Sequence, residues 1–87
     1  MSKLDEWVRE EAEGLRRTRD ELAVQAKLGV AELRDRWEIL EKRWYELEGR
    51  LKVVADETHQ DVEDARAAAK LLVEELREGY EHLKSHL

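Results

Sequence analysis

Residues 30–54, VAELRDRWEILEKRWYELEGRLKVV, decide the fold. Apolar side chains return along this stretch after alternating steps of three and four residues, with no polar interruption. Such heptad spacing is typical of an α-helix that buries one stripe against other helices. The stripe consists of Val30, Leu33, Trp37, Leu40, Trp44, Leu47, Leu51 and Val54. We therefore predict a helix whose stripe is a helix-packing interface, in a coiled coil or in a globular core.

The same pattern extends over almost the whole chain of 87 residues. If polar Glu11 and Thr18 fill two gaps, apolar residues recur every ~3.6 positions from Leu4 to Leu87, which is the period of a straight α-helix. The sequence has no proline and no phenylalanine, and charged residues make up 44% of it. That composition is typical of long helices and coiled coils. The predicted fold class is all-α, in a single helical domain spanning residues 1–87.

Two positions are candidates for a break in the helical pattern. The better one is residues 55–59, where the stripe thins and acidic residues gather. The weaker one is Gly29, which could cap the end of a helix. If neither position broke, the chain would form one continuous helix ~125 Å long at 1.5 Å per residue. Breaks at both would give three segments of similar length, suited to a three-helix bundle.

The stripe could pack against a second copy in a parallel coiled coil. Arg36 and Arg43 would then meet Glu41 and Glu48 of the second copy at flanking positions. Two facing indoles in one layer would crowd such a dimer, however, and overpacking typically costs ~1–3 kcal/mol. The charges favour this arrangement, and the size of tryptophan opposes it.

A fold-back near residue 57 sets large side chains against small ones, which packing favours. It brings Trp44 toward Ala69 and Lys70, and Trp37 toward residues 76–79. The final third would contribute Ala65, Ala69, Leu72, Leu76 and Tyr80 to the helix-packing interface. We therefore expect an antiparallel coiled-coil hairpin or helical bundle. The apolar residues of segment 1–27 must then find a third helix position in the same chain or a second copy.

Charge limits the classes of partner. The net charge is −6, and residues 55–87 hold nine acids against four bases. An acidic surface repels phosphate, so nucleic-acid binding is disfavoured. The long amphipathic pattern is broadly similar to exchangeable apolipoproteins and to the polyester-granule proteins called phasins, which makes a lipid or granule surface an alternative partner. Repulsion between the acidic third and anionic lipid argues against that alternative.

No motif for enzymatic chemistry, a cofactor or a metal stands out. His82 and His86 are four residues apart with Glu78 before them, but a structural zinc site normally needs four ligands. His59 lies in an acidic segment without the spacing of a calcium loop. The sequence also has no cysteine, and it contains no apolar segment long enough to suggest a signal peptide or a membrane span. We expect a cytoplasmic protein that is not an enzyme.

The run TRDELAVQAKLGVAELRDRWEILEKRW, residues 18–44, resembles small uncharacterised coiled-coil proteins of Gram-negative bacteria. This resemblance covers about half of the chain and implies no activity. The expected function is protein–protein interaction or self-association, as a scaffold, adaptor or regulator. The expected partner is a second copy, giving a homo-oligomer, or another helical protein.

Overall fold

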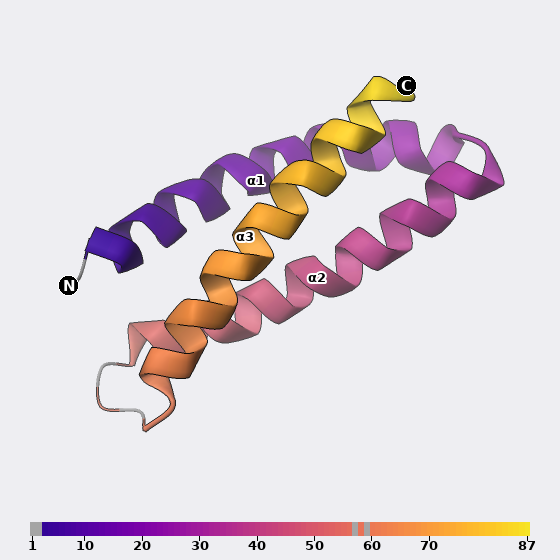
Figure 1. Cartoon of the computed structure of the whole chain (residues 1–87). Coiled ribbons are helices and arrows are strands. Elements are labelled where there is room, and N and C mark those ends of the chain that lie inside the picture. The colour runs from indigo at the N-terminus through magenta and orange to yellow at the C-terminus, as the bar shows by residue number, and fades with distance from the viewer. Residues whose placement is uncertain (1–2, 57, 59) are drawn as a thin grey trace.

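The computed structural model of the chain describes residues 3–56, 58 and 60–87, and nearly all of them are helical (Figure 1). Helix α1 spans Lys3–Leu28, α2 spans Ala31–Ala55 and α3 spans Val62–Ser85. No strand occurs among these described residues. The chain is thus an all-α bundle of three helices, not one continuous rod.

The first turn, at residues 29–30, is very short. The backbone N–H of Gly29 donates to the carbonyl of Ala26 at 3.3 Å, and α2 restarts two residues later. Val30 is extended, with φ −67° and ψ 161°, and provides no side-chain cap. Its side chain is 67% exposed. Val30 therefore differs from its predicted place in the packing stripe, because it serves as the backbone N-cap of α2 and precedes the helix.

The second connection links α2 to α3 and covers the predicted break at 55–59. Helix α2 ends at Ala55, and Asp56 Oδ1 accepts hydrogen bonds from the Thr58 backbone N–H at 3.1 Å and the Thr58 hydroxyl at 2.7 Å. Asp61 then caps α3. His59 lies outside the described residues, so its predicted surroundings are not described.

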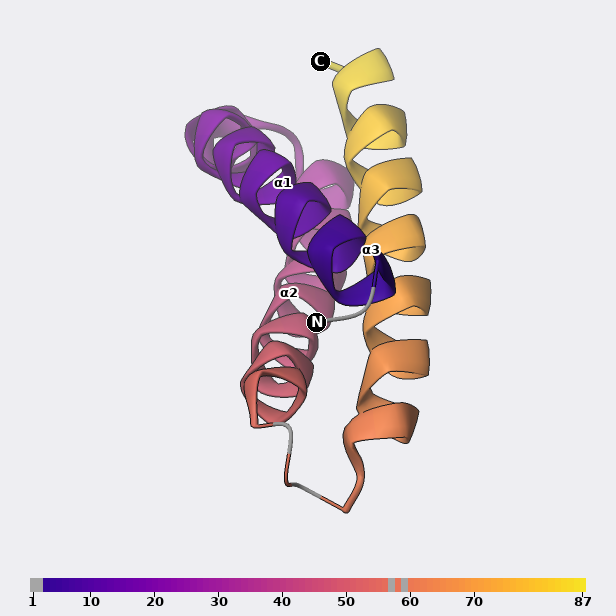
Figure 2. The same ribbon diagram turned by 90° about the vertical axis from the view of Figure 1, so that its left-hand side faces the viewer.

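Helices α2 and α3 lie side by side and run in opposite directions, while α1 crosses over both of them (Figures 1 and 2). The bundle measures 44 × 18 × 16 Å, with a radius of gyration of 13.8 Å. All three helices contribute to one apolar core. From α1 come Val8, Ala12, Leu15, Leu22 and Ala26; from α2, Trp37, Leu40, Trp44 and Leu47; from α3, Ala69, Leu72, Val73, Leu76, Tyr80 and Leu83.

The register between α2 and α3 differs from the expected fold-back by about one helical turn. A Cβ added at Gly79 would meet Leu40 Cδ2, and Arg43 pairs with Glu75 at 3.3 Å. Trp44, the neighbour of Arg43, therefore lies level with this part of α3 and not with Lys70. The shift follows from the length of the connection, because α3 begins only at Val62.

The unpaired apolar residues of segment 1–27 find their place within the same chain. Val8, Leu15 and Leu22 of α1 are each at most 6% exposed. Their burial against α2 and α3 removes the need for a second copy to cover them.

Candidate interaction surface

Most of the predicted packing residues lie in the interior of the bundle. Those that are buried are Trp37, Leu40, Trp44, Leu47, Val54, Ala65, Ala69, Leu72, Leu76 and Tyr80. Leu33 and Leu51 are partly buried and pack against the core from its edge. The stripe is therefore occupied by contacts within the chain, and a partner of the folded bundle would have to use another surface.

Two buried residues of α3, Val73 and Leu83, were not among the predicted interface residues. Val73 is fully buried although it follows Leu72 directly. Adjacent buried positions on one helix indicate that two neighbours cover it, which is the case here because α3 contacts both α1 and α2. The apolar pair Leu72–Val73 was the signal in the sequence for a third helix.

Tyr80 places both an aromatic ring and a polar hydroxyl in the core. Its ring centroid lies 6.1 Å from that of Trp37. Its hydroxyl is buried and has no hydrogen-bond partner among the described residues. Burial and, to a lesser degree, the nearby carboxylate of Glu41 raise the pKa of the Tyr80 phenol, because both disfavour its ionised form.

Arg19 of α1 binds Glu41 of α2 through two nitrogens. Arg19 Nε donates to Glu41 Oε1 at 2.6 Å, and Nη2 donates to Oε2 at 2.7 Å. The guanidinium carbon also lies 5.6 Å from the ring centroid of Trp44 and 5.7 Å from that of Tyr45. The paired hydrogen bonds raise the pKa of Arg19 further above its already high ordinary value. This cluster fixes α1 on the aromatic face of α2.

Two more ion pairs join α1 to α3. Arg66 Nε donates to Asp5 Oδ1 at 2.7 Å, and Asp5 is 1% exposed. Arg77 pairs with Glu11 at 2.5 Å. Both pairs join residues far apart in sequence, and no local spacing signals them.

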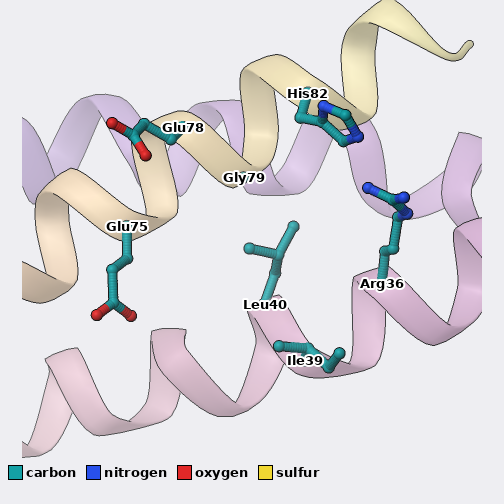
Figure 3. Close-up of a pocket in the computed structure, with 7 residues that line it drawn as sticks. All are labelled: Arg36, Ile39, Leu40, Glu75, Glu78, Gly79 and His82. Carbon is teal, nitrogen blue, oxygen red and sulfur yellow. The ribbon is translucent and has the colours of Figure 1, made fainter.

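The side of the α2–α3 pair away from α1 carries an open groove of about 530 Å³ (Figure 3). Leu40 points from α2 toward Gly79 of α3, and the missing Cβ of Gly79 makes room for it. Ile39 lies along the α2 side and is 58% exposed. The groove is lined by Arg36, Ile39, Leu40, Glu75, Glu78, Gly79 and His82. Exposed Ile39 and the floor formed by Leu40 and Gly79 therefore lie between two charged edges.

Charge is distributed unequally on those edges. The α3 edge carries Glu75 and Glu78, and the α2 edge carries Arg36. At one end, Arg43 joins Glu75 across the two helices at 3.3 Å. At the other end, Arg36 and His82 point toward one another (Figure 3). The lining thus places Glu75, Glu78 and His82 on the α3 edge, Arg36 on the α2 edge, and apolar side chains between them.

His82 of α3 and His86, at the C-cap of that helix, do not form part of a larger ligand set among the described residues. The ring centroids of His82 and His86 are 4.5 Å apart. Among the described residues, no group of three or more His, Cys, Asp or Glu side chains is placed to hold a metal ion. The pair instead completes the end of α3, where His86 Nδ1 lies 2.9 Å from the carbonyl oxygen of His82.

A second hollow of about 410 Å³ lies between α1 and α2. Its lining is mostly charged: Lys27, Arg34, Trp37, Glu38, Glu41 and Lys42. Trp37 is its one large apolar side chain and is only 7% exposed. The hollow therefore lacks an exposed apolar side chain such as Ile39 of the α2–α3 groove.

No protein-family model matches the sequence, and no match was found among curated proteins or solved structures. Within the described residues, none of the three helices has the length and apolar character that crossing a bilayer requires.

Proposed function

We propose that this chain is a non-enzymatic protein–protein interaction module, in which α2 and α3 form an antiparallel coiled-coil hairpin and α1 braces it from one side. The groove on the other side then takes a helix of another protein. The proposal rests on a groove in which exposed Ile39 stands beside a floor formed by buried Leu40 and Gly79, with Glu75 and Glu78 on the α3 edge and Arg36 on the α2 edge.

The size and chemistry of the groove suit one large side chain of a partner helix. Amphipathic helices bind apolar grooves through anchors repeated every three or four residues. Here Ile39 is largely exposed in an otherwise charged surface. An anchoring leucine or tryptophan would cover Ile39 and lie over the groove floor formed by Leu40 and Gly79.

The charged edges of the groove determine which charges the partner helix should carry beside that anchor. Basic residues would face Glu75 and Glu78 on α3, and acidic residues would face Arg36 on α2. Complementary charges of this kind select partners and accelerate encounter more than they add affinity. The preferred partner is therefore an amphipathic helix with one acidic edge and one basic edge.

The test uses a designed helical peptide with a leucine and tryptophan stripe, glutamates on one edge and lysines on the other. Titration into the isotope-labelled chain should shift the backbone amide signals of Ile39, Glu78 and Gly79. Ile39→Asp should weaken binding at least ~10-fold, because it sets a carboxylate where the apolar anchor must lie. The free Ile39→Asp chain should keep its helicity, because residue 39 is exposed.

Val24→Asp provides the matched control, since Val24 is 64% exposed on α1, away from the groove. This variant should bind the peptide like the unmodified chain. Shifts confined to α1, or equal weakening by both substitutions, would rule out the groove as the binding surface.

A further inference from the structure

The turn between α1 and α2 lacks the features that usually end a helix. No proline is present, and neither Val30 nor any other side chain caps α2. Gly29 does not have a positive φ, so its backbone conformation is one that other residues also adopt. The turn is thus imposed by the packing of α1 onto its own bundle, and local sequence does little to enforce it.

The apolar stripe also runs through this turn without a change of phase. At 100° per residue, Leu22 and Ala26 of α1 fall on the same helical face as Leu33 and Trp37 of α2. Val30, exposed at the turn, would return to the edge of that face if the helix were continuous. The sequence of residues 3–55 is therefore compatible with one long helix that keeps a single packing side.

We propose that the chain exchanges α1 with a second copy of itself, through opening of the turn at residues 29–30. In the exchanged dimer, α1 and α2 form one continuous helix, and α1 of each copy packs on α2 and α3 of the other. A short connecting loop favours such exchange. In the closed form, two residues must reverse the direction of the chain, and opening the loop removes that constraint.

Every contact that holds α1 in the closed bundle can form again between copies. Arg19 would bind Glu41 of the second copy, and Asp5 and Glu11 would bind its Arg66 and Arg77. The exchange therefore changes the turn and leaves the core as it is.

Two substitutions at the turn should shift the equilibrium in opposite directions. A Cβ added at Gly29 would lie 3.1 Å from Leu33 Cδ1 and 3.4 Å from the Gln25 carbonyl oxygen. Gly29→Ala therefore crowds the closed turn and favours continuous helix, and it should tighten the dimer by at least ~10-fold over its two turns. Light scattering coupled to size exclusion, across a dilution series, gives the dissociation constant.

Ala31→Pro should have the reverse effect. Ala31 is the first residue of α2, where proline fits, and the extended Val30 suits the position before proline. In a continuous helix the same proline would remove a hydrogen bond and collide with the preceding turn. Ala31→Pro should therefore weaken the dimer by at least ~100-fold and leave the monomer folded.

A charge-reversed pair distinguishes exchange from an ordinary dimer. Arg19→Glu alone and Glu41→Arg alone each place like charges together inside a closed bundle. When the two variants are mixed, exchange restores opposite charges at both α1–α2 contacts, so heterodimers should dominate in native mass spectrometry. Their continuous helices should also extend the particle to ~80 Å in small-angle scattering.

The proposal fails if Gly29→Ala remains monomeric at every concentration, or if the mixed variants form no more heterodimer than random association gives. It is independent of helix binding in the α2–α3 groove, which lies on the side away from α1 and stays open in both forms.

Discussion

Tyr80 combines complete packing with an unsatisfied polar group. Its ring fills the core beside Trp37, yet its buried hydroxyl has no hydrogen-bond partner among the described residues. Leaving a buried hydroxyl without a partner costs about 1–3 kcal/mol. Tyr80 is therefore the position where a small chemical change should raise stability.

Tyr80→Phe should increase the free energy of unfolding at neutral pH by about 1 kcal/mol, since it removes the hydroxyl and keeps the ring. The effect should grow in alkali. Burial raises the pKa of Tyr80 in the folded chain above its ordinary value of 10.0, so the phenol ionises more readily in the unfolded chain. The free energy of unfolding of the unmodified chain should therefore fall as the pH rises above 10, and Tyr80→Phe should remove this part of the loss. Urea unfolding at neutral and alkaline pH measures both effects.

The control for this change is Tyr45→Phe, because Tyr45 is 60% exposed. It should leave the alkaline loss of stability as it is in the unmodified chain. An equally steep alkaline loss in Tyr80→Phe would mean that other groups cause it.

At the residue scale, heptad spacing predicts which side chains face inward but not what their polar ends meet. Trp37 and Trp44 are 7% and 2% exposed. The pairing of Asp5 with Arg66 joins positions 61 apart and depends on the placement of whole helices. Periodicity within one helix contains no information on that placement.

Helix α1 is held on α2 by one well-formed cluster around Arg19. The planar guanidinium makes two parallel hydrogen bonds with Glu41 and lies over the rings of Trp44 and Tyr45. Lysine carries the same charge but has neither the paired geometry nor the flat surface. The cluster should therefore distinguish arginine from lysine.

Arg19→Lys should lower the free energy of unfolding by about 1 kcal/mol, because it loses one hydrogen bond to a charged partner and the stacking on Trp44. Arg17→Lys should change it by less than ~0.5 kcal/mol, since Arg17 is exposed on the outer face of α1. Thermal and urea unfolding of both variants make the comparison. Equal losses would show that the Arg19 cluster adds nothing specific.

At the element scale, helices were easier to predict than the joints between them. The unbroken stripe of α2 identifies its length closely, because strict heptads rarely arise in loops. The start of α3 was harder. Thr58 followed by Asp61 resembles a capping box, but Thr58 bonds to Asp56 and the helix begins at Val62. Several Ser, Thr and Asp residues can cap, and tertiary packing selects among them.

The three tryptophans are largely shielded from solvent by the folded bundle. Trp37 and Trp44 are buried, and Trp7 is partly buried beneath Arg77. Adding vesicles of phosphatidylcholine and phosphatidylglycerol should therefore leave the tryptophan emission maximum unchanged, because the three indoles already lie in the core or pack against it. Circular dichroism on the same samples checks that the helices stay folded.

A blue shift on adding the anionic vesicles, with helicity maintained, would instead favour binding to a lipid surface by an opened bundle. Neutral vesicles of phosphatidylcholine alone serve as the control for light scattering. A shift with both kinds of vesicle would indicate apolar insertion that does not depend on charge.

At the scale of the molecule, the all-α class followed from composition and period, but the choice among rod, hairpin and bundle did not. Each arrangement buries the same stripe of α2. Charge at Arg36 and Arg43 favoured the parallel rod, and the small residues near Ala69 favoured folding back. The outcome depends on two short connections that have few residues typical of turns. It also depends on contacts such as Arg19–Glu41, which form only when α1 is in place.

Three helices are an odd number, and this has a geometric consequence. The start of α1 and the end of α3 lie toward opposite ends of a body 44 Å long (Figure 1). The bundle would act as a rigid spacer that holds proteins fused to its two ends apart. A pull along that line would load α1 and α3 in shear, with Asp5–Arg66 and Glu11–Arg77 sharing the force.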